Sequence, residues 1–129
     1  MLSICAVIAV RNEAPYLQVL LPILAAQQID VAILDNASTD GSPDIYRACS
    51  GSPVVKLAHQ EYRGYFSLSE QLEAKKRIYS ELKHDWVIHQ DADEILEHSS
   101  SGLSLRQAIE SADAAGYTAL NFDEFVFLP

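Results

Sequence analysis

The chain is poor in positive charge. It carries nine lysines and arginines against eighteen aspartates and glutamates, which gives a formal net charge of −9. A protein that binds nucleic acid needs a basic face to neutralise phosphates, so this composition argues against a nucleic-acid partner. An anionic nucleotide would instead have to be held by a metal ion, by backbone N–H groups or by a few well-placed arginines.

Cysteine and long apolar runs are also scarce. Cys5 and Cys49 are the only cysteines, and neither has a spacing typical of metal or redox sites, so both are predicted to be small buried residues in a reducing, cytoplasmic compartment. No apolar run reaches the ~20 residues of a membrane helix, so no transmembrane segment is expected. Leu2–Val10 lacks the basic start of a signal peptide, which favours a buried strand.

Several catalytic signatures are missing. The turn Val10–Ala14 contains neither the glycines of a dinucleotide-binding turn nor a Walker A pattern, which counts against NAD or FAD. The histidines lack the helical i, i+4 spacing of zinc enzymes. There is no Gly-x-Ser-x-Gly elbow either, so an α/β-hydrolase triad has no support.

The sequence does show alternating strand and helix patterns across one domain-sized chain of 129 residues. Strands are predicted at Ser3–Val10, Val31–Leu34, Val54–Ala58, Trp86–Gln90 and Thr118–Leu128. Helices are predicted at Asn12–Gln27, Pro43–Cys49, Ser67–Leu82 and Ser104–Ala115. This alternation predicts an α/β fold, with a mainly parallel sheet flanked by helices on both faces.

The helix predicted at Ser67–Leu82 is amphipathic. Apolar residues that include Leu72 and Ile78 recur near helical spacing, and they are predicted to face the core. The basic run Lys75–Arg77 is interpreted as part of the solvated face.

Polar residues follow three of the predicted strands. Arg11 and Glu13 come after the first, Asp35 ends the second, and Asp91 and Asp93 follow the fourth. In parallel sheets, ligands bind outside the carboxyl ends of the strands, so these residues predict a single polar site. Paired carboxylates supply the hard oxygen ligands that suit Mg²⁺ or Mn²⁺.

Structural roles compete with these assignments. Aspartate is common in turns, so the Asp-x-Asp pair could simply cap its turn. Asp35 could accept from a nucleobase or a ribose hydroxyl, whereas Asp40 is better explained as a turn former. Arg63 could contact a phosphate or remain a solvated loop charge. Glu94 could assist a metal, orient an aspartate or be a solvated loop acid.

Three ordered segments, Val7–Ala14, Leu34–Ser42 and Trp86–Glu94, together resemble family 2 glycosyltransferases of the GT-A fold. The likeness is to the bacterial subgroup whose opening motif is Arg-Asn-Glu and whose metal motif is Asp-x-Asp-Glu. It spans nearly the whole chain. The resemblance implies a Rossmann-like sheet and transfer of a sugar from a nucleotide-diphosphate sugar to an acceptor hydroxyl, with inversion and with Mn²⁺ or Mg²⁺ as cofactor.

The resemblance also implies roles for individual residues. Asp35 would contact the nucleobase, and Arg11 and Glu13 would line its pocket. Asp93 would bind the metal directly, while Asp91 would lie beside it and face the ribose or sugar. Arg63 matches a nucleotide-binding position only loosely.

Members of the family have a further C-terminal part that holds the acceptor site and the usual carboxylate base. The chain is therefore expected to be the N-terminal, nucleotide-sugar-binding part, residues 1–129, with the base beyond Pro129. Such a fragment could be inactive alone, and its acceptor could be a glycan, a lipid or a small molecule. Two alternatives stay open: a non-catalytic interaction or sugar-binding module, and a related nucleotidyltransferase, which the missing Gly-rich signature disfavours.

Overall fold

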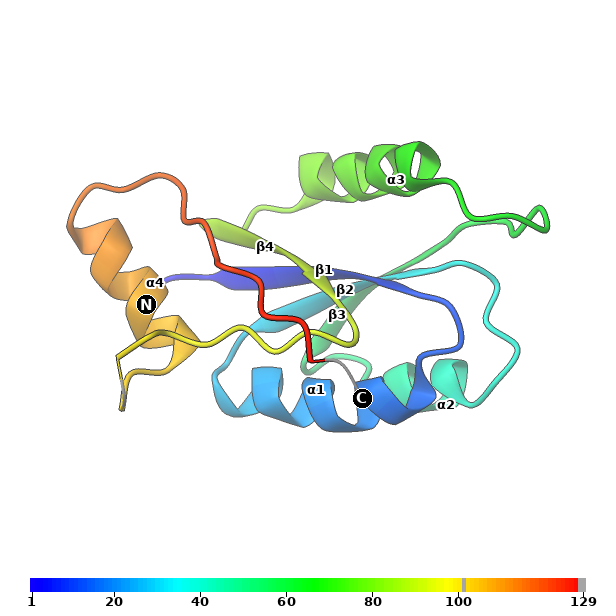
Figure 1. Cartoon of the computed structure of the whole chain (residues 1–129), viewed down its shortest axis with the longest axis horizontal. Coiled ribbons are helices and arrows are strands. Elements are labelled where there is room, and N and C mark those ends of the chain that lie inside the picture. Colours follow the sequence, from blue (N-terminus) through cyan, green and yellow to red (C-terminus); the bar gives the residue numbers. More distant parts are fainter. Residues whose placement is uncertain (101, 128–129) are drawn as a thin grey trace. The chain divides into compact units, whose positions relative to one another are not determined.

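The computed structural model describes residues 1–100 and 102–127, which fall into two compact units that divide after Ile95 (Figure 1). The strands are β1 (Ile4–Val10), β2 (Asp30–Asp35), β3 (Val54–His59) and β4 (Trp86–Asp91). The helices are α1 (Ala14–Ala26), α2 (Ser42–Ala48), α3 (Leu68–Glu81) and α4 (Leu105–Ala114). All strands and the first three helices belong to the first unit, and α4 belongs to the second.

The four strands form one parallel sheet in the order β3-β2-β1-β4. The chain first builds outward from β1 through β2 to β3, and then crosses to the other side of β1 to add β4. The strand order therefore reverses between β1 and β4, which is where ligands bind in open α/β sheets. The predicted fold class is confirmed.

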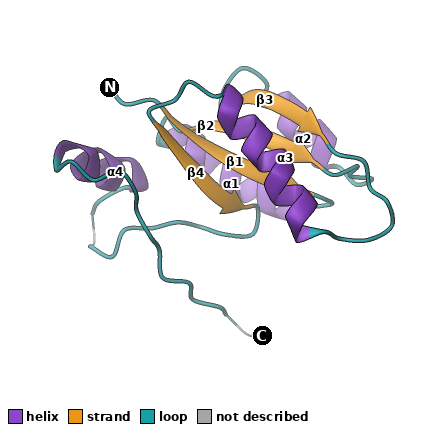
Figure 2. Cartoon of the chain, turned by 90° about the horizontal axis from the view of Figure 1, so that it is seen from above, coloured by secondary structure: helices purple, strands orange, loops and turns teal. Residues whose placement is uncertain are grey.

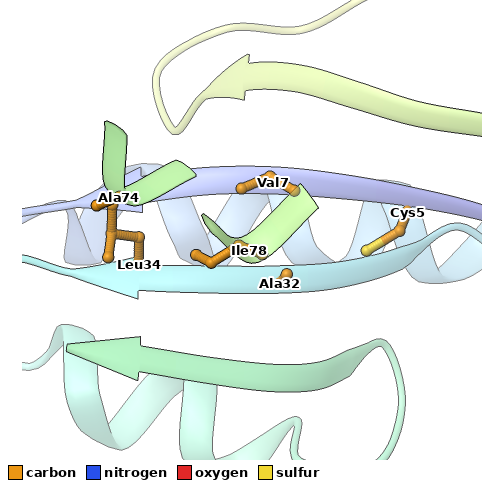
Figure 3. Close-up of a cluster of buried hydrophobic side chains, with 6 residues drawn as sticks. All are labelled: Cys5, Val7, Ala32, Leu34, Ala74 and Ile78. Carbon is orange, nitrogen blue, oxygen red and sulfur yellow. The ribbon is translucent and has the colours of Figure 1, made fainter. Parts of the chain in front are cut away.

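Helices cover both faces of this sheet. Figures 1 and 2 show α1 and α2 on one face and α3 on the other. Between α3 and the sheet lies a cluster of small and branched apolar side chains (Figure 3), formed by Cys5, Val7, Ala32, Leu34, Ala74 and Ile78. Burial raises the pKa of the Cys5 thiol to about 12, so this cysteine stays protonated and serves as a small core residue, as predicted. Cys49, which was also predicted to be buried, is only partly buried.

The inward face of α3 differs from the predicted one. Ile78 is buried as expected, but Leu72 is 44% exposed. Lys75, assigned to the solvated face, is fully buried, whereas Lys76 is exposed as predicted. The apolar pattern of α3 was ambiguous, because the residues that face the sheet are Ala74, Lys75 and Ile78 rather than the leucines. Ala74 is small and therefore a weak signal for the buried face.

The predicted strand at Thr118–Leu128 is wrong for residues 118–127, which form neither strand nor helix. Its Leu128 lies outside the described residues. Phe125 and Phe127 are exposed at 80% and 94%. A strand needs a neighbour to satisfy its backbone groups, and no strand among the described residues pairs with this segment. Apolar composition alone therefore gave a false signal.

The helix ends largely follow the predicted caps. The Ser67 side chain accepts from the first turn of α3, Ser104 completes a capping box at α4, and Gly116 has a φ of 84° just beyond α4. The exception is α1, whose N-cap position is Glu13 rather than Asn12. Within residues 1–100 and 102–127, no helix has both the length and the apolar character needed to cross a bilayer.

The α3 face can be tested by comparing Ile78→Ala with Leu72→Ala. Truncating the buried Ile78 should lower the free energy of unfolding by about 2–5 kcal/mol, because it leaves a cavity under the helix. Truncating the exposed Leu72 should change it by less than about 0.5 kcal/mol. Urea unfolding followed by circular dichroism measures both, and equal losses would contradict the observed helix face.

Candidate functional site

The strand register brings the predicted site residues to one edge of the sheet. Asp35 on β2 is the Cα partner of Val10 on β1, and Asp91 on β4 is the partner of Ala9. Because β1 lies between β2 and β4, the Arg11–Glu13 turn that follows β1 leaves the sheet between the two aspartates. The three polar strand ends thus meet at the point where the strand order reverses.

Arg11 braces the loops around this edge. Its Nη1 donates hydrogen bonds to the backbone oxygens of Asn36, at 2.8 Å, and Ala37, at 2.9 Å. Its guanidinium carbon also lies 3.4 Å from the centroid of the Tyr62 ring, a cation–π contact. Arg11 therefore joins the loop after β2 to the loop after β3. A direct contact between Arg11 and a nucleotide remains a prediction.

A second set of hydrogen bonds fixes the turn between β1 and α1. Asn12 has a φ of 54°, and its side-chain oxygen accepts from the backbone N–H groups of Thr39, at 2.7 Å, and Asp40, at 3.2 Å. Asp40 in turn accepts from the N–H of Ala14 at the start of α1. Hydrogen bonds from Ser42 hold the pKa of Asp40 below its usual value. The structural role predicted for Asp40 is confirmed.

Asp35 is almost completely buried, and both of its carboxylate oxygens have donors from the chain itself. Oδ1 accepts from the Ser38 hydroxyl at 2.6 Å, and Oδ2 accepts from the Tyr46 hydroxyl at 2.8 Å. Burial and this hydrogen bond raise the pKa of Tyr46 to about 12. The Asp35 carboxylate thus anchors α2 to the end of β2, and its predicted nucleobase contact remains untested.

The next residue, Asn36, has a buried side-chain oxygen that lacks a hydrogen-bond donor within the described part of the chain. Buried polar atoms without partners are rare, so Asn36 stands out as an acceptor that the described residues leave unsatisfied. The sequence analysis did not select Asn36, because an unsatisfied acceptor is visible only in three dimensions.

The Asp-x-Asp segment forms a tight turn at the end of β4. The Glu94 N–H donates to the Asp91 carbonyl at 3.2 Å, and the Asp91 N–H donates to the Glu94 carboxylate at 3.1 Å. Glu94 therefore holds the backbone of the turn at Asp91, and any contact between Glu94 and a metal stays a prediction. The Asp91 side chain is 54% exposed and Asp93 is also exposed, so both carboxylates are accessible from solvent.

Glu13 shares the electrostatic environment of this pair. Its pKa is raised, mainly by burial and then by the negative charges of Asp93, Asp40 and Asp91. We call Glu13, Asp91 and Asp93 the acidic edge. A cation would relieve their mutual repulsion, so these residues fit a divalent ion.

In residues 1–100 and 102–127, no three His, Cys, Asp or Glu side chains are arranged to hold a metal on their own. Mg²⁺ and Mn²⁺ are bound through one or two carboxylates plus substrate phosphates, so a site of this kind does not require such a group.

Lys75, which the sequence analysis missed as a site residue, lies next to the acidic edge. Its side chain is fully buried, with Nζ 3.4 Å from the Gln90 carbonyl oxygen and 3.7 Å from the Asp91 carboxylate. The pKa of Lys75 is lowered by its burial, and the neighbouring Asp91 and Glu94 offset this effect only in part. The only sequence signal for its burial was that it directly follows Ala74, which faces the sheet.

Arg63 has partners away from the acidic edge. It forms an ion pair with Glu70 at the start of α3, and its guanidinium lies 5.7 Å from the Tyr65 ring. No ion pair links Arg63 to the acidic edge in the portion of the chain that the structure describes. Arg63 also lines a shallow depression of about 430 Å³, together with Gln60, Glu61, Ser69, Glu70, Glu73 and Arg77.

A Rossmann-like parallel sheet with carboxylates at its switch point defines the class of the protein as an α/β fold consistent with GT-A. The chain matches Glycosyl transferase family 2 over residues 5–123, and it belongs to that family. No curated protein shows significant similarity to it. The matched range includes β1 from its second residue onward, the other three strands, the acidic edge and α4.

The anchoring role of Asp35 predicts the effect of Tyr46→Phe. Removing the hydroxyl leaves a buried carboxylate oxygen without its donor, so the free energy of unfolding should fall by about 1–3 kcal/mol. Tyr16→Phe, at a half-exposed site, is the matched control and should have almost no effect. Denaturant unfolding of the two variants tests this, and similar stabilities would contradict an anchoring role for Asp35.

The raised pKa of Glu13 predicts a pH-dependent stability difference. Above its pKa in the folded state, Glu13 carries a charge that burial and neighbouring acids disfavour, so Glu13→Gln should be more stable than the parent protein at pH 7. The difference should shrink as pH falls and vanish below the unfolded-state pKa of about 4.3. Thermal unfolding between pH 3 and pH 8 measures it, and a constant difference would refute this assignment.

Proposed function

We propose that the chain binds a nucleotide-diphosphate sugar together with Mn²⁺ or Mg²⁺, and that it acts in glycosyl transfer to an acceptor hydroxyl with inversion. The observation that carries this proposal is the acidic edge, which lies at the switch point of the sheet in a member of Glycosyl transferase family 2. The acceptor is a glycan, a lipid or a small molecule. The two free cysteines favour a cytoplasmic location.

Asp93 is the proposed direct protein ligand of the ion, with Asp91 beside it. Asp93 is exposed and forms part of a turn that leaves the end of β4. A bound divalent ion would neutralise the charge that develops on the departing diphosphate. Because the donor itself supplies phosphate oxygens, one or two carboxylates from the chain suffice.

The nucleotide would lie across the ends of β1 and β2. Asp35 would contact the nucleobase, as the resemblance implies, while its bonds to Ser38 and Tyr46 keep that strand end in position. The side-chain oxygen of Asn36, which has no donor among the described residues, would accept from an N–H of the same base. Arg11 and Glu13 would line the same pocket. Arg63 would have to leave Glu70 to contact a phosphate. Asp91, oriented by the Glu94 turn, would accept from a ribose or sugar hydroxyl.

The metal assignment is tested with Asp93→Asn, which is nearly isosteric and should fold normally. Calorimetric titration of UDP, GDP and dTDP, with and without Mn²⁺, should show Mn²⁺-dependent binding of one nucleotide to the parent chain. Mutation of a residue that only supports a metal ligand typically weakens metal binding by about tenfold or more. Loss of a direct ligand should therefore weaken the Mn²⁺-dependent nucleotide binding by more than about tenfold.

Asp44→Asn makes the same chemical change at an exposed position on α2, so it should bind as the parent does. If Asp93→Asn binds as tightly as the parent, the metal assignment is wrong. If the parent binds no nucleotide under any condition, a non-catalytic interaction module becomes the better explanation.

A further inference from the structure

The buried Lys75 distinguishes the two aspartates of the acidic edge. A fully buried ammonium group is costly unless it is paired, and its partners here are the Gln90 carbonyl and the Asp91 carboxylate. The next residue on α3, Lys76, is exposed. Of these two neighbouring lysines, only Lys75 is buried, behind the end of β4. An apolar side chain at that position would be buried with a smaller desolvation penalty.

The sheet register explains why Lys75 reaches Asp91. Cys5 and Val7 of β1 belong to the apolar cluster under α3, and Asp91 is the partner of Ala9, two residues further along the same face. Asp91 therefore lies on the face of the sheet that α3 covers. Among the ion pairs of the described residues, Asp91 has this one with Lys75, and none includes Asp93.

We propose that Lys75 is a positioning residue, which holds the Asp91 carboxylate toward α3 and leaves Asp93 as the direct ligand of the divalent ion. The inference rests on the proposed function. Held in this way, Asp91 keeps its other oxygen available to a hydroxyl of the bound donor. The positive charge of Lys75 also weakens binding of the ion alone, so the ion binds well only together with a negatively charged diphosphate.

The test compares Lys75→Met with Lys76→Met, which remove the same charge from adjacent positions of one helix. Mn²⁺ binding without nucleotide is measured by electron paramagnetic resonance, and Mn²⁺-dependent binding of UDP, GDP and dTDP by calorimetry. In Lys75→Met, the freed Asp91 and the lost positive charge should tighten binding of Mn²⁺ alone by about three- to tenfold. The Mn²⁺-dependent binding of the nucleotide should weaken. Lys76→Met should match the parent in both measurements.

The opposite signs of these two effects separate positioning from a merely structural role. If both affinities fall together in Lys75→Met, or if neither changes, the inference is overturned. If the proposed function is wrong, the result is different, because the parent chain itself then binds no nucleotide. In that case, the binding of Mn²⁺ without nucleotide still tests the effect of the Lys75 charge.

Lys75→Met should fold, because the apolar side chain suits a buried position and Asp91 retains contact with water. If it does not fold, Lys75→Gln replaces it. Glutamine keeps a hydrogen-bond donor for the Gln90 carbonyl but carries no charge, so the same two opposite effects are expected. Equal Mn²⁺ affinities of Lys75→Gln and the parent chain would then overturn the inference.

Discussion

The parallel pairing of β1 with β2 on one side and β4 on the other is the constraint on which the rest of the structure depends. Parallel register aligns the carboxyl ends of all three strands, so residues far apart in the sequence leave the sheet side by side. The order β3-β2-β1-β4 also reverses direction between β1 and β4, which is where ligands bind in open α/β sheets. The acidic edge is a consequence of this pairing, and no local feature of the three segments would create it.

This arrangement concentrates negative charge, and the surrounding contacts limit its cost. Arg11 and Asn12 join the loops after β1 and β2 by hydrogen bonds, so the acids are carried on a braced framework. Lys75 places a buried positive charge behind Asp91. Glu13 still has a raised pKa, mainly because it is partly buried and then because Asp93, Asp40 and Asp91 lie near it. The proposed divalent ion would offset the remaining negative charge.

Much of the fold was predictable because local signals agreed. The four strands and four helices lie close to their predicted positions, since buried parallel strands are continuously apolar and helix ends carry recognisable caps such as Ser104. The failures arose where one signal stood alone. Residues 118–127 are rich in apolar side chains, but no strand among the described residues pairs with them. Leu72 has helical spacing but lies on the exposed side of α3.

The sequence by itself determined the α/β class, the family resemblance and the residues at the strand ends, because periodicity and short motifs are local properties. Only the tertiary structure decided what those residues do there. It assigned Asp35 to the support of α2, left the Asn36 oxygen unsatisfied, and buried Lys75 against Asp91. These roles depend on burial and on contacts between segments distant in the chain, and neither quantity is encoded in the local pattern of residues.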